Sequence, residues 1–244
     1  MSIRALEGQV LDHIPVDNVL VSVFDKTGLD VLVHGLTAAN PKVRFLSTGG
    51  TYTAIQKMLG DRAANNLVEV ATYTGFPEMD GGLVKTLHPK IHAGILGERG
   101  NQKHQEYLRQ TLNGGVFIDM VVVNAYPFEQ MVSKIKAGDV DEKTGQPFNF
   151  ENARGNIDIG GPTIIRAAAK NFPSCAVVCD PNDYQSVVEG VTVETGCTTF
   201  AQRARLVPKV FELTARYDTA VAAFMSESMK DPRAVRSLYK FGTG

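Results

Sequence analysis

The side chains best suited to chemistry are concentrated in residues 83–96, which read LVKTLHPKIHAGIL. Lysine, threonine and histidine side chains alternate there with apolar residues that follow neither a helix nor a strand period. Pro89 lacks an N–H group and favours extended geometry at His88, so residues 85–89 are predicted to form a turn or short loop. Such a loop is suited to holding an anion and moving protons. A solvated surface loop with incidental histidines is the alternative.

Two loops nearer the N-terminus are suited to binding phosphate. An apolar, β-branched strand is predicted over residues 18–24, followed by the loop DKTG and a helix over 29–39. The plan repeats with a strand over 43–46, the loop STGGT and a helix over 52–59. Glycines allow a close approach to backbone N–H groups, and helix starts add partial positive charge. In an open parallel sheet both loops would lie at the carboxyl edge, where ligands bind.

Strands and helices alternate along the rest of the chain, which predicts an α/β fold with a parallel sheet flanked by helices. Further strands are predicted over residues 67–71, 119–124 and 175–179. Further helices are predicted over 103–112, 130–136, 181–188 and 199–225, and in the segment that ends near Lys170. Pro208 is expected to mark the entry to the long helix or a break in it.

The predicted organisation is one compact domain over residues 18–225 with a C-terminal helical extension. Residues 1–17 are interpreted as a poorly patterned N-terminal lead-in, and residues 226–244 as a loosely attached polar tail. No internal linker, repeat or low-complexity tract interrupts the pattern.

The composition indicates a reduced, globular, cytoplasmic protein. The 244 residues are 43% hydrophobic and carry a formal net charge of -1, which argues against nucleic-acid or acidic-membrane partners. No apolar run reaches the roughly 18 residues of a membrane span, and the N-terminus lacks the apolar core of a secretory signal. Cys175, Cys179 and Cys197 form no CxxC pair and are expected to be small buried hydrophobes.

Seven motifs in order carry a resemblance to a known family: SVFDKTGL, STGGT, TGFPEM, VKTLHPKIHAGIL, VVVNAYPFE, NIDIGGPTIIRAAAKN and RYDTAVAAF. Together they resemble the inosine monophosphate cyclohydrolase half of a bifunctional purine-biosynthesis enzyme, over about residues 18–225. The resemblance implies a methylglyoxal-synthase-like open parallel sheet and a nucleotide substrate. It also implies a homodimer, no cofactor and no metal. A separate aminoimidazole-carboxamide ribotide transformylase is the partner it suggests.

The implied reaction is an intramolecular ring closure with loss of water, the last step of purine synthesis. A carboxamide nitrogen attacks a formyl carbon of the same ribotide, so no second molecule has to be brought in. The enzyme must fold the formyl group toward the amide, remove an amide proton, stabilise a tetrahedral oxyanion and protonate the departing oxygen.

The resemblance assigns roles to matching residues of this chain. Nucleotide binding, chiefly to the phosphate, falls on Asp25, Lys26, Thr48, Gly49, Gly50 and Thr51. Lys85 and Thr86 match the central substrate-binding pair, and Lys85 is also expected to stabilise the oxyanion or hold the formyl oxygen.

At the other end of the substrate, Asn124 and Tyr126 match residues that bind the base, and Tyr126 is a candidate oxyanion donor. Asp158 and Ile159 match the turn that recognises the carboxamide. Lys170 matches the proton donor and acceptor. A lysine acts as a base only where burial or a neighbouring cation, such as Lys85, favours its neutral form.

Structural readings stay open for several of these residues. Tyr126 is alternatively a half-buried aromatic residue at a strand end, and Asp158 a helix cap. Lys170 in a last helical turn is alternatively a surface charge that complements the helix dipole. His88 and His92 are expected to be structural, with hydrogen bonds inside their loop.

Two positions depart from the family pattern. Leu83 stands where the family usually has an arginine, and Phe24 where it usually has a serine. The first change removes a donor of a charged hydrogen bond, which is typically worth about 1.5–3 kcal/mol. These two departures favour an alternative function, a nucleotide-binding regulatory module of the same fold. A methylglyoxal-synthase-like phosphate lyase is a second alternative. The NIDIGG and RAAAKN motifs argue against the lyase.

Overall fold

A five-stranded parallel sheet forms the centre of the computed structural model, which describes residues 6, 9–77, 79 and 83–242. The strand order is β4-β3-β2-β5-β6, and every neighbouring pair is parallel. Val19 of β2 lies opposite Phe45 of β3 on one side and Met120 of β5 on the other. The predicted α/β class is confirmed, and the sheet is compatible with a methylglyoxal-synthase-like fold.

The strands are short apolar runs because helices cover the sheet on both faces. The bounds of the strands are β1 Ile14–Pro15, β2 Asn18–Val23, β3 Arg44–Ser47, β4 Leu67–Glu69, β5 Met120–Asn124, β6 Ala176–Val178 and β7 Cys197–Thr198. The bounds of the helices are α1 Leu29–Ala39, α2 Gly49–Leu59, η1 Gly60–Arg62, α3 Ala63–Asn66, α4 Val70–Thr74, α5 Pro89–Leu96, α6 Gln102–Glu106, η3 Tyr107–Thr111, α7 Phe128–Ala137, α8 Phe150–Gly155, α9 Gly160–Lys170, η4 Pro181–Asp183, α10 Tyr184–Val193, α11 Phe200–Ser228 and α12 Pro232–Arg236.

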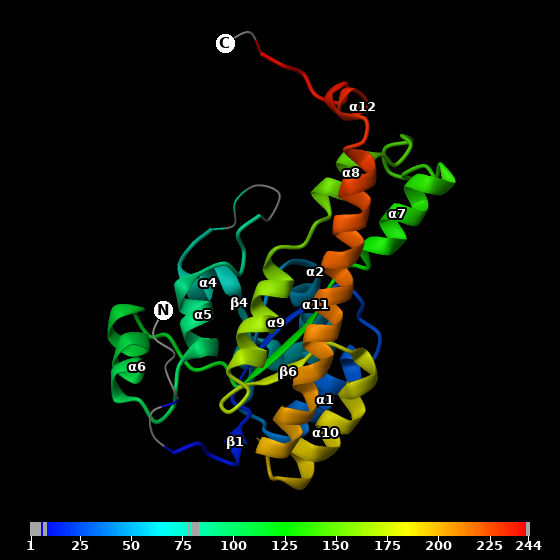
Figure 1. Ribbon diagram of the computed structural model, residues 1–244. Coiled ribbons are helices and arrows are strands. Elements are labelled where there is room, and N and C mark those ends of the chain that lie inside the picture. The colour runs from blue at the N-terminus through cyan, green and yellow to red at the C-terminus, as the bar shows by residue number, and fades with distance from the viewer. Residues whose placement is uncertain (1–5, 7–8, 78, 80–82, 243–244) are drawn as a thin grey trace. The chain divides into compact units, whose positions relative to one another are not determined.

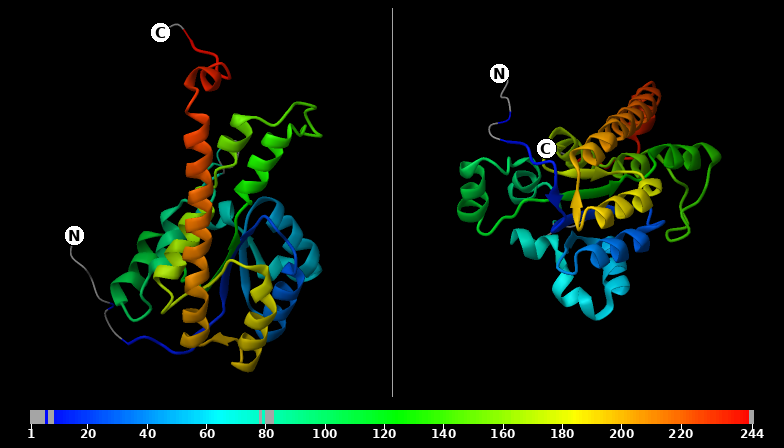
Figure 2. Two further views of the ribbon diagram at one scale, coloured as in Figure 1. Left: turned by 45° about the vertical axis from the view of Figure 1, so that its right-hand side comes forward. Right: turned by 90° about the horizontal axis from the view of Figure 1, so that it is seen from below.

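The order of the strands decides which helices cover which face. The chain steps from β2 through β3 to β4, then returns to β5 and continues in the opposite direction to β6. Right-handed crossovers therefore place α1 and α2 on one face and α9 on the other. α10 packs on α1, and α5 packs on α9 (Figures 1 and 2).

The chain divides into two compact units. The first comprises residues 1–125 and 160–211 and contains the whole parallel sheet. The second comprises residues 126–159 and 212–244, and its helices are α7, α8, α12 and the later part of α11. Within the described ranges, no helix combines the length and the apolar composition that a membrane span requires. The predicted domain boundaries at residues 18 and 225 stay a prediction.

Aromatic side chains form the core of the second unit. The ring of Phe128 lies edge-on to the rings of Tyr217 and Phe224, with centroids 6.0 and 5.6 Å away. Phe150 stacks on the other side of Phe224 at 5.9 Å. These contacts hold α7 and α8 against the later part of α11.

Residues 85–88 form the predicted turn and loop, but residues 89–96, where no helix was predicted, form the helix α5. Pro89 occupies the first helical position, and the Nδ1 atom of His88 caps the helix by accepting the Lys90 N–H at 3.0 Å. Ile91 and Ile95 are buried four residues apart on one face. The helical period was missed because His92 and Gly94 interrupt it.

Other boundaries shift for local reasons. α2 begins at Gly49, three residues before its prediction, and takes up most of the STGGT loop. The third strand ends at Glu69, and α4 follows at once. Pro208 lies inside the continuous helix α11 and breaks nothing. Residues 14–15 are not lead-in, because β1 pairs with β7 and Ile14 is buried.

Candidate functional site

The candidate site lies at the carboxyl edge of the sheet, where the strand order reverses. β2 and β5 are neighbours, yet the chain leaves β2 toward β3 and leaves β5 toward β6. Ligands of open α/β sheets bind at such a switch point. The loop 24–28 follows β2, the STGG turn follows β3, and Asn124 ends β5. The sequence therefore predicted correctly that the two glycine-containing loops share one edge.

The N-terminus of α2 supplies backbone donors at this edge. Thr48 is the extended N-cap residue, and the first helical bond runs from the Tyr52 N–H to the Thr48 carbonyl at 3.2 Å. The N–H groups of the first turn have no acceptor within a helix, so they are available to an anion and add to the positive end of the helix dipole. An added Cβ at Gly50 would meet no atom of the described residues within 4 Å.

The Thr51 side chain is engaged within the protein, and its predicted contact with the nucleotide stays a prediction. Its hydroxyl donates to the Val23 carbonyl at 3.0 Å and accepts the Val23 N–H at 3.2 Å. The side chain is buried and joins the start of α2 to the end of β2. What Thr51 offers a ligand is therefore its backbone N–H.

Lys85 brings a cation to the same turn. An ideal Cβ on Gly49 would lie 3.3 Å from the Lys85 Nζ atom, so the ammonium group reaches the first residue of α2. Lys85 is half-buried, and the neighbouring Thr86 is buried. Backbone donors, a helix dipole and a lysine thus converge on one point, which is the composition of a phosphate or carboxylate site.

Gly49 and its neighbour provide a matched test of this turn. Gly49 has φ +54°, a left-handed conformation that costs L-residues roughly 1–2 kcal/mol. We expect Gly49→Ala to lower the free energy of unfolding by about that amount, and the new methyl group to crowd Lys85. Gly50 has no positive φ, so Gly50→Ala should leave stability unchanged or slightly higher. Urea unfolding of both variants measures the difference; equal losses would contradict the assignment.

The loop after β2 is exposed and carries Asp25 and Lys26. The Asp25 carboxylate accepts the Thr27 hydroxyl at 2.7 Å and the Thr27 N–H at 2.9 Å. The Thr27 hydroxyl, ahead of its N–H, lowers the pKa of Asp25, which stays ionised. The Lys26 ammonium donates to the Phe24 carbonyl at 3.3 Å. These bonds fix the conformation of the loop, whose backbone lies at the carboxyl edge of the sheet.

Asn124 holds this loop from the neighbouring strand. Its Oδ1 atom accepts the N–H groups of Phe24 at 2.8 Å and Asp25 at 2.9 Å, and its Nδ2 atom donates to the Asp25 carbonyl at 2.8 Å. The predicted contact of Asn124 with a base stays a prediction. The structure shows that its side chain is engaged with the loop backbone.

Lys170 is exposed in the last turn of α9. A lysine at this position complements the helix dipole, so the structure is compatible with Lys170 as a surface charge. A role in proton transfer stays a prediction, and mutagenesis has to distinguish the two.

Three predicted residues belong to the second unit. Tyr126 and Asp158 are half-buried, and Ile159 is 61% exposed. The Asp158 N–H donates to the Tyr217 hydroxyl at 2.7 Å, and that hydroxyl donates to the Asn156 carbonyl at 3.4 Å. Burial raises the pKa of Tyr217. The sequence reasoning did not name Tyr217 as a support of this turn, although it noted the RYDTAVAAF motif that contains it.

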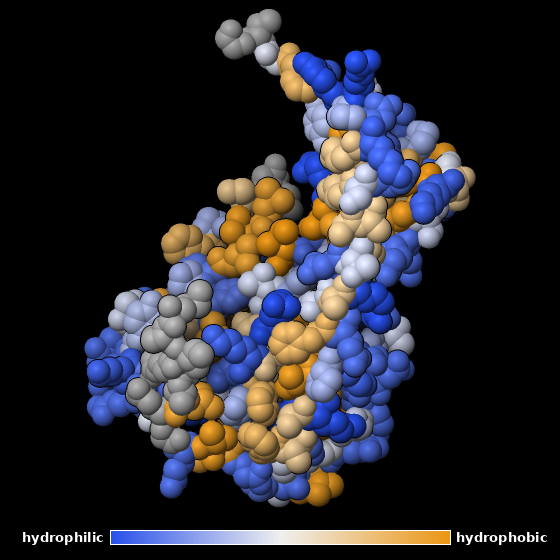
Figure 3. All heavy atoms as spheres, in the orientation of Figure 1, coloured by the Kyte–Doolittle hydropathy of each residue, from blue (hydrophilic) through white to orange (hydrophobic). Residues whose placement is uncertain are grey.

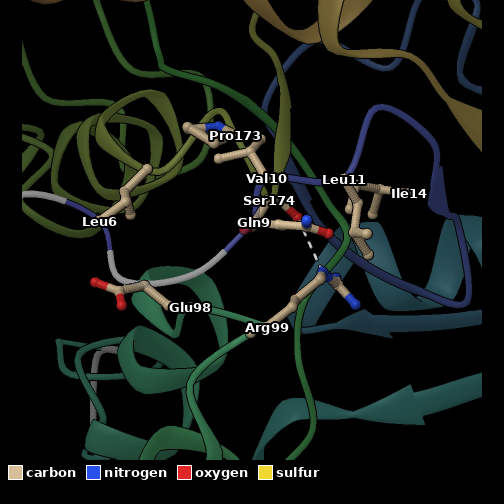
Figure 4. Close-up of a pocket in the computed structure, with 10 residues that line it drawn as sticks. Leu6, Gln9, Val10, Leu11, Ile14, Glu98, Arg99, Pro173 and Ser174 are labelled. Carbon is tan, nitrogen blue, oxygen red and sulfur yellow. Dashed lines mark hydrogen bonds between the residues drawn. The ribbon is translucent and has the colours of Figure 1, made fainter.

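The hollows of the first unit that lie outside this constellation include a pocket beside Arg99 and an apolar groove beside α5. Figure 4 shows a small pocket beside Arg99, which donates to the Ser174 carbonyl at 3.4 Å and pairs with Asp119. Asp119 directly precedes β5 and accepts the N–H of Asn18 at 2.6 Å. This pocket is therefore at the amino edge of the sheet, away from the carboxyl edge.

The second hollow is an apolar groove between the end of α4, the start of α5 and residues 111–113. Apolar residues gather over this part of the surface (Figure 3), and the lining residues Phe76 and Met79 are 65% and 57% exposed. Lys90 lies over the Tyr73 ring at 4.5 Å and donates to the Asn113 carbonyl at 3.0 Å. The Lys90 ammonium group is therefore engaged in contacts within the protein.

The two histidines of the central stretch have different surroundings. His88 caps α5, as described above, which fits the structural role expected for it. The Nε2 atom of His92 is buried and has no hydrogen-bond partner among the described residues, and burial lowers the pKa of this side chain. The expected bond of His92 within the loop is therefore not made at Nε2. Among the described residues, no group of three or more His, Cys, Asp or Glu side chains is arranged to hold a metal ion.

Comparisons with known proteins give consistent results. The family model of the AICARFT/IMPCHase bienzyme matches residues 168–241. The bifunctional purine biosynthesis protein PurH of Chlorobaculum parvum is 46% identical over 209 residues, which are 86% of this chain and 36% of that protein. PurH of Rhodospirillum rubrum is 43% identical over 222 residues, 91% of this chain and 38% of that protein. The chain thus spans little more than a third of the length of these relatives.

A solved structure supports the fold. The crystal structure of ForH matches with a TM-score of 0.64 and 27% sequence identity. The match covers 84% of this chain and 97% of the ForH chain.

Proposed function

The chain belongs to the AICARFT/IMPCHase bienzyme family, and on that premise we propose that it is an inosine monophosphate cyclohydrolase of purine biosynthesis. The substrate is 5-formamidoimidazole-4-carboxamide ribotide. Its carboxamide nitrogen bonds to its formyl carbon, and the formyl oxygen leaves as water. A homodimer and a separate transformylase partner stay predictions from the resemblance.

The observation that supports this proposal best is the position of the Lys85 ammonium group beside Gly49. One end of a ribotide is a phosphate, and the α2 N-terminus with the adjacent lysine is suited to an anion of that kind. Lys26 adds a second cation, which is exposed on the neighbouring loop. The exposed Gly49 and Gly50 allow an anion to come close to the backbone N–H groups.

The proposed chemistry divides the work among a few residues. Lys85, Thr86 and the α2 turn hold the nucleotide, and the Lys85 charge stabilises the oxyanion that forms when the amide attacks the formyl group. Lys170 removes the amide proton and protonates the departing oxygen. Tyr126 donates to the oxyanion, and Asp158 with Ile159 recognises the carboxamide. These roles are carried over from the resemblance.

The test is a spectrophotometric assay of inosine monophosphate formation from the formylated ribotide, combined with calorimetric binding of inosine monophosphate. Turnover with saturable binding is expected. Binding without turnover would support the regulatory module of the same fold instead. The loss of turnover would then be attributed to Leu83 and Phe24. Release of phosphate from dihydroxyacetone phosphate would support the lyase and contradict the proposal.

Leu83 allows a specific prediction within this proposal. Its side chain is 70% exposed, so an arginine can be placed there without disturbing the core. We expect Leu83→Arg to lower the KM for the ribotide by about tenfold, because a charged hydrogen bond is typically worth about 1.5–3 kcal/mol. Val193→Arg adds the same charge at another exposed apolar position and should leave KM unchanged. An unchanged KM in Leu83→Arg would show that other residues already supply the contact.

A further inference from the structure

We propose that Thr51 is a positioning residue: its hydroxyl joins the start of α2 to the end of β2 and so sets the two nucleotide-binding loops relative to each other. The proposal rests on the function proposed above, because that function assigns both loops to the substrate. The resemblance assigns Thr51 to the nucleotide itself, whereas the role proposed here acts through the loop after β2.

The first step concerns the point at which β2 loses its neighbour β3. The pairing of β2 with β3 ends at Val21, which lies opposite Ser47, whereas the pairing with β5 continues to Val23. Backbone groups of a strand turn alternately to its two neighbours, so Val23 turns to the same side as Asp17. The Asp17 carbonyl accepts the Arg44 N–H at 2.7 Å, which identifies this side as that of β3. Val23 therefore extends beyond the last paired residue of β3.

The second step concerns what takes the place of β3 at Val23. The Thr51 hydroxyl donates to the Val23 carbonyl at 3.0 Å and accepts the Val23 N–H at 3.2 Å. A hydroxyl is both a donor and an acceptor, so one side chain satisfies both backbone groups. Val23 and Thr51 are only 4% and 5% exposed, and buried backbone groups without a partner cost free energy. The hydroxyl thus continues the hydrogen bonding of β2 where β3 has ended.

The third step concerns the opposite side of the same segment. Asn124 of β5 accepts the N–H groups of Phe24 and Asp25 and donates to the Asp25 carbonyl, with all three bonds 2.8–2.9 Å long. The segment after Val21 is therefore held from both sides. The Asn124 bonds fix it relative to β5, whereas the Thr51 bonds fix it relative to α2.

The place of Thr51 in α2 connects these bonds with the substrate. Thr51 is the third residue of α2 and directly follows Gly49 and Gly50, so its backbone belongs to the helical turn that is suited to an anion. The loop that carries Lys26 begins directly after Val23. With the hydroxyl in place, both loops are held in one arrangement before the nucleotide binds. Such preorganisation favours affinity, because less of the chain has to be ordered on binding.

The variant Thr51→Val replaces the hydroxyl by a methyl group and keeps the branched side chain. We expect the Val23 amide to exchange hydrogen about tenfold faster, because the N–H loses its acceptor. The Phe24 and Asp25 amides, whose acceptor is Asn124, should change less. We also expect the KM for the ribotide and the Kd for inosine monophosphate to rise about threefold to tenfold, the size of one lost hydrogen bond, with kcat changed less.

Two further variants make the test specific to the Thr51 hydroxyl. Thr51→Ser keeps the hydroxyl and should restore Val23 exchange, KM and Kd to nearly the values of the wild type. Thr37→Val is the matched control, because Thr37 is also buried in the first unit and its hydroxyl donates to the Val33 carbonyl at 2.7 Å within α1. It removes a buried threonine hydroxyl away from the two loops, so KM and Kd should stay unchanged.

The readouts separate the possible failures. A higher KM with unchanged Val23 exchange in Thr51→Val would overturn the inference in favour of direct contact between Thr51 and the nucleotide. Faster exchange with unchanged KM and Kd would overturn it as well, since the joined loops would then not affect binding. Equal defects in Thr51→Ser, or an equal rise in KM in Thr37→Val, would assign the effect to packing or to general stability and reject the proposed role. If the wild type neither binds nor converts the nucleotides, the proposed function fails, and Val23 exchange still decides whether the hydroxyl holds the loop.

Discussion

Lys85→Met is expected to reduce kcat/KM for ring closure by about 10²–10³-fold, the range found when one donor to a developing oxyanion is removed. The Lys85 ammonium lies at the start of α2, where an ideal Gly49 Cβ would be only 3.3 Å away. It therefore lies beside the backbone N–H groups at the start of α2. Methionine retains most of the chain length and the apolar stem, so the change isolates the charge.

The measurement for Lys85 is steady-state kinetics together with calorimetric titration of inosine monophosphate. Loss in kcat at nearly unchanged product affinity would assign Lys85 to the oxyanion, whereas equal loss of affinity would assign it to the phosphate. Lys85→Arg keeps the charge and should retain more activity than Lys85→Met. Lys103→Met, at an exposed lysine of α6, is the control for a general change in charge. Full activity of Lys85→Met would remove Lys85 from the site.

Lys170→Ala is expected to reduce kcat by about 10²–10⁴-fold with little change in KM, the usual contribution of a positioned acid or base. Lys170 is exposed in the last turn of α9, which is also where a lysine with a purely structural role would lie. A lysine that only complements the helix dipole would contribute to stability and nothing to turnover. The two roles therefore predict different results in one assay.

Lys57 provides the matched control for Lys170. Both are exposed lysines in the last turn of an eleven-residue helix of the first unit, Lys57 in α2 and Lys170 in α9. Lys57→Ala should leave turnover unchanged and should alter thermal stability as much as Lys170→Ala does. Equal turnover in both variants would return Lys170 to its surface role and leave the proton transfer to another group.

Tyr126, Asp158 and Ile159 belong to the second unit, so variants of these residues need a control within that unit. The hydrogen bond from the Asp158 N–H to Tyr217 shows how the backbone of the turn is held in that unit. The aromatic contacts of Tyr217 with Phe128 add to this support. Variants of Asp158 are therefore best compared with Tyr217→Phe, which removes the hydroxyl that holds the turn and leaves the Asp158 carboxylate in place.

Much of the local structure was determined by the sequence alone. Short β-branched runs predicted β2 and β5, because a strand covered on both faces has to be apolar throughout. The spacing of apolar residues predicted α1 with its observed bounds. The two glycine-containing loops after β2 and β3 were predicted to lie at one sheet edge, because successive parallel strands point the same way.

The tertiary structure decided which distant groups meet. Nothing near Lys85 in the sequence shows that its ammonium group reaches Gly49, since that contact depends on how residues 83–96 return to the sheet. The same holds for Asn124, whose amide serves the loop after β2 only because β5 is inserted beside β2. Local patterns determine elements through backbone preferences and burial, whereas side-chain contacts across many residues follow from the order of the strands. That order is fixed by packing of the whole first unit, and the pattern of a single sequence does not contain it.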